Sequence, residues 1–398
     1  MKNGTTDRII FHIDMNAFFC TVAEIKDPKL RGKAFAIGRK ESLKGVISTA
    51  SYEARKYGIH SAMPLKEAYR LLPSLLVIDG DYKEYSKYHK LFVKMIREYT
   101  DLIEVASIDE VYADMTETIK NIHPIVLAKL IQYRLLSELN LKASIGIGST
   151  LFYAKMASDM KKPLGLTIIS RKNAKKMLYP LSVSDIYGVG KKTFPRLIDN
   201  GIKTIGDFMD EKNKDKVISL VGENTYLYVV SHVRGESNNI VDPNRYSDSQ
   251  SISTMTTFDI YKTTINEVLY ESRLLLKDIY KRLMYETYLT KSVILTLRDD
   301  DFNTISRRKT LKDYTNDFDI LNTLLEDLVM EYFVEGKNYR LIGVGFSNII
   351  KKKEIKEETN LFNLDNKKEE IEKIMKDINS KYSDKLIWVK DKEKNNGT

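Results

Sequence analysis

The chain has 398 residues, of which 42% are hydrophobic, so we expect several packed domains rather than one core. Its 64 Lys and Arg residues exceed its 55 Asp and Glu residues by nine, a balance that suits a polyanion such as nucleic acid, although a merely lysine-rich protein would share it. The chain has a single cysteine, Cys20, so a disulfide within the chain is excluded. The spacing of the five histidines does not match a zinc site. The sequence shows no signal peptide and no membrane-spanning run, so we expect a cytoplasmic protein.

The first 170 residues show strands and helices in alternation. RIIFHIDM (8–15) is an apolar run of strand type that ends on Asp14. KEYSKYHKLFVKMIREYT repeats apolar residues at helix period, LIEVASIDEVYADM predicts a hairpin, and HPIVLAKLIQYRLLSELN predicts a second helix that begins at Pro124. The strands KASIGIG and GLTIIS then flank the helix TLFYAKMASDM. This succession predicts an antiparallel sheet backed by helices, a ferredoxin-like α+β layer.

The remaining segments differ in pattern. Residues 20–76 interrupt the first layer with a small helical unit, in which STASYEARKYG reads as a capped helix ending at Gly58. Residues 171–237 predict short helices, and the polar segment around 238–249 predicts a linker. Residues 250–350 alternate strand, helix, two strands, helix and strand, a second ferredoxin-like pattern. From Lys351 onward, residues 351–398 form a charge-rich tail with one amphipathic helix.

Three carboxylates stand at strand ends of the first predicted sheet. Asp14 ends one strand, and Asp109 and Glu110 lie near the bend of the hairpin. Acids that converge in this way repel one another unless a cation is present, and oxygen ligands suit Mg²⁺. Two such ions, about 3.5–4 Å apart, would align an attacking and a leaving oxygen for phosphoryl transfer. Three unrelated surface acids are the alternative, because the pair Asp-Glu is common at turns.

A second group of side chains matches the chemistry of phosphate. Tyr52 and Arg55 are three residues apart and so share a helix face, and an arginine fork fits phosphate oxygens. Thr49 adds a hydroxyl, and Lys162, just past a helix end, can reach a triphosphate from another side. Taken alone, each of these residues is equally consistent with an ordinary surface position.

The segment IYGVGKK (186–192) places Gly188 and Gly190 in a turn between two short helices, followed by Lys191 and Lys192. Free backbone amides at such a turn bind anions, and the arrangement resembles a helix-hairpin-helix, which holds a nucleic-acid phosphate without reading bases. A plain connection between helices is the alternative.

In the last predicted domain, FNTISRRKTL carries three basic residues along one strand. Alternation places Arg307 and Lys309 on one face and Arg308 on the other. We consider Arg307 and Arg308 candidate DNA contacts, although a solvated edge strand explains the same pattern.

Five segments, taken in order, resemble the motif series of Y-family DNA polymerases, with the bacterial DNA polymerase IV branch the nearest. They are HIDMNAFF, GVISTASYEARKYGIHSAMP, ASIDEVYADM, ASIGIGSTLFYAKMASDMKKPLG and DIYGVGKKT. The likeness extends from about residue 8 to about residue 349. It implies a palm (1–19 and 77–170), fingers (20–76), a thumb with the helix-hairpin-helix (171–237), a linker (238–249) and a little finger (250–350).

The resemblance also implies roles for single residues. Asp14 and Asp109 would bind two Mg²⁺ ions, Glu110 the catalytic one, and Met15 would offer its backbone carbonyl. The other implied contacts are to the incoming nucleotide: Thr49, Tyr52, Arg55 and Lys162 to the triphosphate, and the aromatic pair Phe18 and Phe19 under the sugar. Two positions depart from the family pattern: Asn16 replaces a second Asp common among relatives, and Leu164 replaces a small polar residue.

The tail segment EETNLFNL resembles a sliding-clamp binding peptide that ends in Leu361 and Phe362, with Glu358 where such peptides usually carry Gln. The implied activity is template-directed addition of deoxynucleotides to a primer, past damaged bases, with low fidelity and processivity. The implied partners are primer-template DNA, deoxynucleoside triphosphates and the clamp, and a monomer without membrane contact is expected. A non-catalytic factor that binds DNA and clamp, or a nucleotide cyclase with a two-metal palm, are the competing functions.

Overall fold

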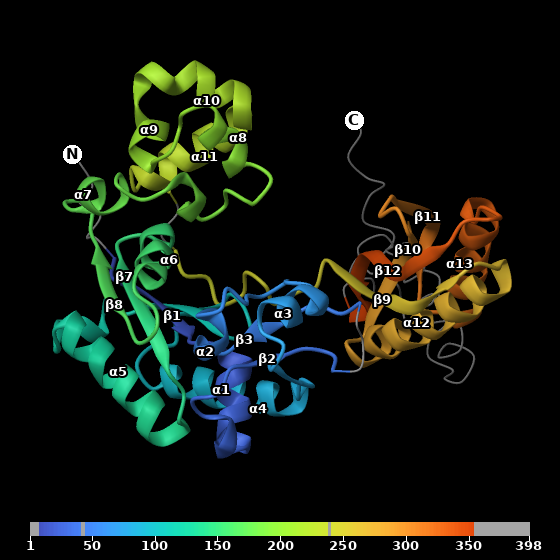
Figure 1. Ribbon diagram of the computed structural model, residues 1–398, viewed down its shortest axis with the longest axis horizontal. Helices are drawn as coiled ribbons and strands as arrows, with labels where there is room; N and C mark the ends of the chain where they lie inside the picture. Colours follow the sequence, from blue (N-terminus) through green and yellow to red (C-terminus); the bar gives the residue numbers. More distant parts are fainter. Residues whose placement is uncertain (1–7, 41–43, 238–239, 354–398) are drawn as a thin grey trace, which may run out of the picture. The chain divides into compact units, whose positions relative to one another are not determined.

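The computed structural model describes residues 8–40, 44–237 and 240–353 (Figure 1). The chain divides into two compact units, Met1–Asp248 and Ser249–Thr398. Both combine helices with their own sheets, so the predicted α+β, multidomain class is confirmed. Within the described ranges, no helix is both long and apolar enough to cross a membrane. The proposed clamp contacts Leu361 and Phe362 lie outside these ranges.

The first unit is built on a five-stranded sheet with the spatial order β5-β6-β1-β7-β8. Neighbouring strands are antiparallel except for the parallel pair β7 and β8. The first four strands of this order have the ferredoxin-like arrangement expected from the sequence. The strand bounds are β1 (Ile10–Met15), β5 (Ile103–Val105), β6 (Glu110–Asp114), β7 (Ala143–Gly148) and β8 (Leu166–Ile169).

Helices cover both faces of this sheet. On one face α4 (Tyr82–Arg97) and α5 (Pro124–Leu139) enclose an apolar core together with Phe11 and Ile13 of β1. The helix α6 (Leu151–Met160) lies across the other face (Figure 1). Because side chains alternate along a strand, His12 and Asp14 face α6 rather than the apolar core. The polar residues of the sheet are therefore gathered beneath one helix.

Two glycines allow α6 to approach the sheet closely. A Cβ atom at Gly146 would lie 2.0 Å from the carbonyl oxygen of Ala154, and one at Gly148 would lie 2.4 Å from the Ala154 nitrogen. The helix begins after Thr150, whose hydroxyl accepts a hydrogen bond from the Tyr153 amide. The backbone of α6 thus rests directly on β7, and side chains one turn further along the helix are held over β1.

Residues 20–76 contain short helices, as expected, but they are not purely helical. A small sheet with the order β3-β2-β4 runs through them. Its strands have only two or three residues, too few to show an alternating pattern, and for this reason the sequence did not predict them. The elements of this region and its borders are α1 (Phe18–Lys26), η1 (Pro28–Leu30), β2 (Phe35–Ile37), β3 (Thr49–Ala50), α2 (Tyr52–Arg55), α3 (Leu65–Leu71) and β4 (Leu76–Ile78).

After β8 the described chain is helical as far as residue 237. The apolar side chains of this part share one core with Phe152, Tyr153 and Met156 of α6, so these helices pack on the same helix that covers the sheet. Its elements are α7 (Ala174–Leu178), η3 (Val183–Asp185), α8 (Phe194–Asp199), α9 (Ile205–Met209), η4 (Glu211–Asn213), α10 (Lys214–Val221) and α11 (Glu223–Val233); a further short turn, η2 (Thr118–Lys120), precedes α5.

The segment that follows, predicted as a polar linker, is anchored to the first sheet over its described part. Val241 is 2% exposed and packs near Ile10 and Tyr112. The buried carboxylate of Glu104 accepts a hydrogen bond from the Asp242 amide and pairs with Arg245 at 3.1 Å. A buried anion with two partners indicates a fixed contact rather than a free chain.

The second unit has the expected succession of elements, but its strand order, β11-β10-β12-β9, differs from that of the first sheet. The last strand of the chain, β12, lies inside the sheet and is buried along most of its length. Strand β9 forms an edge of the sheet and is largely exposed. Both helices cover one face. The bounds are β9 (Ser251–Lys262), α12 (Ile265–Tyr285), β10 (Tyr288–Asp299), β11 (Thr304–Thr315), α13 (Phe318–Tyr332) and β12 (Tyr339–Lys351).

The close contact between α6 and β7 gives a test of the packing. Gly146→Ala should lower the free energy of unfolding by about 2 kcal/mol or more, because the added methyl group collides with helix backbone that cannot move aside. Gly190→Ala is the control, since an added Cβ there meets no atom within 4 Å. Urea unfolding of both variants measures the difference; equal stabilities would contradict the packing described.

Candidate active site

Two of the three predicted carboxylates face each other across neighbouring strands. In the antiparallel pair β1 and β6, Asp14 is the direct partner of Glu110. Asp109 lies one residue earlier, in the turn, where its carbonyl accepts a hydrogen bond from the Met15 amide at 3.0 Å and its carboxylate accepts one from Ser107 at 2.6 Å. All three acids line one cavity of about 360 Å³. The structure thus brings together the acids that the sequence singled out.

Two lysines lie against these carboxylates. Lys155 of α6 donates to Oε1 of Glu110 at 2.6 Å, and Lys162 donates to Oδ2 of Asp14 at 2.6 Å. Lys162 also pairs with Asp159 at 2.8 Å. In the described parts of the chain, no three His, Cys, Asp or Glu side chains are grouped as a metal ion would require. Asp14 and Glu110 are held by ammonium groups in this structure, and Asp109 by the Ser107 hydroxyl.

Burial and neighbouring charge shift the pKa values of this cluster. Burial, together with the adjacent Glu110, raises the pKa of Asp14 to about 7. Burial alone would also raise the pKa of Glu110, but the His12 and Asp14 side chains and the Lys155 ammonium hold that pKa below its ordinary value. The pKa of His12 is lowered by its burial. Of the facing pair, Glu110 is the carboxylate that stays ionised, and Asp14 is the one whose charge needs further compensation.

The predicted triphosphate contacts line the same cavity as the acids. They are Thr49, Tyr52, Arg55 and Lys162. Ser51 caps α2 by accepting a hydrogen bond from the Ala54 amide, and the Arg55 guanidinium lies 4.8 Å from the centre of the Tyr52 ring, which confirms that the two share a helix face. The Tyr52 hydroxyl is buried without a hydrogen-bond partner. Such a group is ready to donate to a ligand oxygen.

The two phenylalanines after Asp14 have different environments. Phe18 is only 3% exposed and belongs to the core beneath the sheet. Phe19 is partly exposed and stacks on Tyr85, with ring centres 4.1 Å apart and planes inclined by 15°. Tyr82 packs against the same pair edge-on, at 6.1 Å from Phe19. Both phenylalanines line the cavity, but Phe19 is the one with a free edge and a rigid support.

Asn16, one of the departures from the family pattern, is a buried connector. Its amide nitrogen donates to the Ser144 hydroxyl at 2.9 Å, and its carbonyl oxygen accepts from the Leu164 amide at 2.8 Å. Ser144 also accepts a hydrogen bond from the Gly165 amide. These bonds fix the loop that carries Lys162. Leu164, the other departure, adopts a left-handed backbone with φ of 59°.

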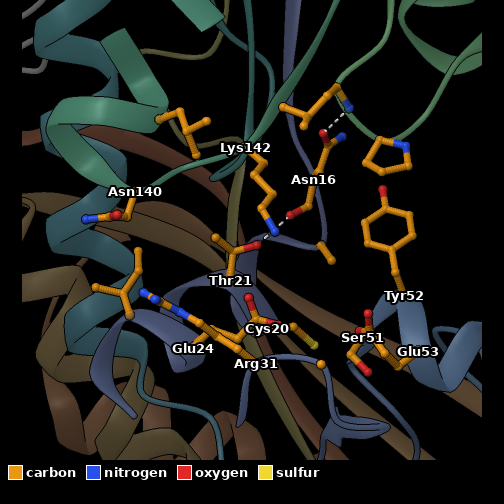
Figure 2. Close-up of a pocket in the computed structure, with 16 residues that line it drawn as sticks. Asn16, Cys20, Thr21, Glu24, Arg31, Ser51, Tyr52, Glu53, Asn140 and Lys142 are labelled. Atoms are coloured by element: carbon orange, nitrogen blue, oxygen red, sulfur yellow. Dashed lines mark hydrogen bonds between the residues drawn. The ribbon is translucent and has the colours of Figure 1, made fainter. Parts of the chain in front are cut away.

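A larger cavity, of about 450 Å³, shares Asn16 and Tyr52 with the smaller one (Figure 2). It contains none of the three acids that define the candidate site. Its charged side chains are balanced in number, with Glu24 and Glu53 against Arg31 and Lys142. The smaller cavity brings the three acids together with Arg55 and Lys162, so we assign the chemistry to it.

None of the candidate DNA contacts lines the smaller cavity. Gly188, with φ of 96°, Gly190 and the exposed Lys191 occupy the turn between η3 and α8. In the second unit Arg307 lies over the ring of Tyr332 of α13, whereas Arg308 is on the opposite face of the edge strand β11. The predicted alternation along this strand is confirmed.

The sequence reasoning missed Lys155, His12 and Tyr85. Lys155 stands in the middle of TLFYAKMASDM, where nearly every neighbour is buried. A lysine at the centre of a fully buried helix requires a carboxylate partner, and this signal was available in the sequence. The stacking of Tyr85 on Phe19 had no such signal, because the two residues are far apart in the chain.

Comparison with known proteins gives consistent matches. Residues 13–159 match the model of the impB/mucB/samB family, and residues 249–361 match that of its C-terminal domain. The chain is 36% identical to a DNA polymerase IV of Oceanobacillus iheyensis, over 96% of this chain and 91% of that protein. It is 37% identical to DNA polymerase IV 1 of Bacillus subtilis, over 96% and 92%.

Solved structures with the same fold belong to Y-family DNA polymerases. A chimera of Dbh and Dpo4 superposes with a TM-score of 0.78 at 25% identity, over 86% of this chain and 100% of that one. A Dbh ternary complex superposes with a TM-score of 0.61 at 25% identity, over 86% and 99%.

The left-handed backbone of Leu164 predicts a gain in stability on replacement. Leu164→Asn should raise the free energy of unfolding by about 1 kcal/mol, because asparagine tolerates this conformation and the leucine side chain, 45% exposed, contributes little packing. Leu102→Asn is the matched control, at a loop leucine that is 44% exposed and has no positive φ. Thermal unfolding compares the two; a loss of stability in the Leu164 variant would contradict the strain.

Proposed function

The chain belongs to the impB/mucB/samB family and is a DNA-directed DNA polymerase of the Y family, and from this premise we propose that it extends primers past damaged template bases by two-metal nucleotidyl transfer. Low fidelity and low processivity are part of this proposal. The observation that supports it most strongly is the convergence of Asp14, Asp109 and Glu110 with the phosphate-matched side chains in one cavity.

The chemistry of the residues present fits divalent metal ions, although in this structure the three acids contact Lys162, Lys155 and Ser107 instead of a common point. Asp14 is buried and its direct partner in register, Glu110, has a side chain only 24% exposed, an arrangement that is unfavourable without added positive charge. The donor set is oxygen only, which suits Mg²⁺. We propose that Asp14, Asp109 and the Met15 carbonyl hold two ions, and that Glu110 holds the catalytic one. Bound there, the ions would supply charge stabilisation at the reacting phosphate and activate the primer hydroxyl.

The remaining side chains of the cavity would bind and orient the nucleotide. Arg55 can offer its guanidinium to phosphate oxygens, since the group lies over the Tyr52 ring and is anchored by the hydrogen bond that its Nε donates to the Ala50 carbonyl at 3.0 Å. The unpartnered Tyr52 hydroxyl and the Thr49 hydroxyl supply further donors. Lys162, held by the Asn16 loop, would turn from Asp14 to the triphosphate. Phe18 and Phe19 would lie under the sugar.

We propose the domain roles that the family likeness implies. Residues 1–19 and 77–170 form the palm, 20–76 the fingers, 171–237 the thumb, and 250–350 the little finger. Gly188, Gly190 and Lys191 would hold the primer-template backbone through the thumb, and Arg307 and Arg308 through the little finger. Of these two arginines, Arg308 is free of the helix-covered face.

Loss of a metal-binding carboxylate should separate catalysis from DNA binding. Asp109→Ala or Glu110→Ala should lower the rate of primer extension by about a thousandfold or more, because transition-state charge is no longer stabilised. Binding of primed DNA, measured by fluorescence anisotropy, should persist. Asp101→Ala, which removes an exposed acid near the same hairpin, should retain activity. Near wild-type extension by either site variant would contradict the two-metal assignment and favour a non-catalytic DNA-binding factor.

The stacked Phe19 should exclude the 2′-hydroxyl of ribonucleotides. Phe19→Val removes the ring edge that faces the cavity, so ribonucleotide insertion should rise about a hundredfold or more relative to deoxynucleotide insertion. Phe92→Val, at a core phenylalanine, should lower stability by about 1–3 kcal/mol without changing this ratio. Single-nucleotide insertion kinetics measure the ratio, and no change in the Phe19 variant would exclude the sugar contact.

We also propose that the tail segment ending in Leu361 and Phe362 binds a sliding clamp, as apolar anchors in a pocket of the clamp. Leu361→Ala/Phe362→Ala should abolish stimulation of synthesis by the clamp and leave unstimulated extension of short primers intact. Primer extension with and without the clamp tests this proposal. If the clamp stimulated the variant as much as the wild-type protein, the tail segment would not be the clamp-binding site.

A further inference from the structure

Lys155 has the surroundings of a bound cation rather than those of a surface lysine. It lies in the middle of α6, and its side chain is only 11% exposed. Its ammonium group is surrounded by three carboxylates: Glu110 at 2.6 Å, Asp159 at 3.4 Å and Asp14 at 3.5 Å. The ammonium donates hydrogen bonds to Glu110 and Asp14 and forms an ion pair with Asp159.

Among the described lysines and arginines, only Lys155 lies within 4 Å of the Glu110 carboxylate. The ring nitrogen Nε2 of His12 is 3.6 Å away, which is too long for a hydrogen bond. Lys162 contacts Asp14 and Asp159 instead. The position of the Lys155 backbone is fixed, because α6 rests on Gly146 and Gly148 of β7. Lys155 therefore reaches Glu110 from a rigid base.

We propose that the Lys155 ammonium is an internal counter-ion, which occupies the place of a divalent cation at Glu110 and Asp14 when none is bound and competes with that cation for the same oxygens. This inference rests on the proposed two-metal function and assigns Lys155 a positioning role: it acts through the carboxylates and touches no substrate. Lys155 keeps the two facing acids ordered before the metal arrives, and it sets how tightly the metal binds.

One of the present partners of Lys155 remains available to it once Glu110 is engaged by a metal. Asp159 lies one turn further along α6, and its side chain is 46% exposed. A rotation of the long lysine side chain toward Asp159 would release Oε1 of Glu110 without moving the helix. Asp159 thus favours the metal-bound arrangement by stabilising the displaced ammonium.

Direct measurement of metal affinity tests the proposal. The full-length protein is titrated with Mn²⁺, and free Mn²⁺ is followed by electron paramagnetic resonance, with Mg²⁺ competition to report the physiological ion. Lys155→Met, which keeps the length of the side chain and removes its charge, should lower the Kd for Mn²⁺ about tenfold. Asp159→Asn should raise the Kd, because the displaced ammonium loses its alternative partner.

Lys161→Met is the matched control. It removes the same charge from an exposed position at the end of α6. Its Kd should change by less than about twofold, because an exposed charge is screened. If Lys155→Met binds Mn²⁺ no more tightly than this control, the counter-ion role is excluded while the metal site stands. If the wild-type protein itself binds no Mn²⁺ at Asp109 and Glu110, as judged against Asp109→Ala, the proposed function fails as well.

Thermal unfolding in EDTA covers the case in which Lys155→Met folds poorly. The variant should unfold at a lower temperature than wild type, because the facing carboxylates lose their counter-ion. Adding Glu110→Gln should restore most of the loss, since the stranded charge is then removed. A double variant that is no more stable than Lys155→Met alone would overturn the proposal.

Discussion

The direct opposition of Asp14 and Glu110 across two antiparallel strands is the constraint on which the first unit depends. Like charges in register repel, and burial strengthens the repulsion. The surrounding fold offsets this with two lysines: one on α6, brought close because Gly146 and Gly148 let the helix rest on β7, and one on a loop that Asn16 holds. The packing of α6 and of the Asn16 loop on the sheet therefore also supplies the positive charge that stabilises the two carboxylates.

This arrangement also explains why the polar residues lie on a single face of the sheet. The face toward α4 and α5 is closed by apolar side chains and supplies the stability of the layer. The face toward α6 carries His12, Asp14 and Glu110, whose burial is unfavourable unless each finds a partner. A fold that separates the two faces in this way can keep a charged cavity without weakening its core.

The sequence predicted the sheet, its covering helices and the meeting of Asp14 with Glu110, because these follow from local periodicity and from strand ends. It did not predict the short strands β2, β3 and β4, whose pairing is set by contacts between distant segments. It did not predict the central place of β12 either, since succession along the chain leaves the order of strands open. The role of Asn16 emerged only from its side-chain hydrogen bonds to distant segments, and that of Leu164 only from its backbone geometry.

The stack of Phe19 on Tyr85 has a consequence for selectivity. The Phe19 ring is stacked on Tyr85 of α4, and this packing restricts its movement. A restricted apolar ring selects a ligand by its volume. If Phe19 lies under the sugar as proposed, its exclusion of a 2′-hydroxyl would not depend on which base the nucleotide carries or on how well that base pairs. Selection of the sugar and selection of the base would then be separate, so a polymerase of this kind could accept a distorted template and still reject ribonucleotides.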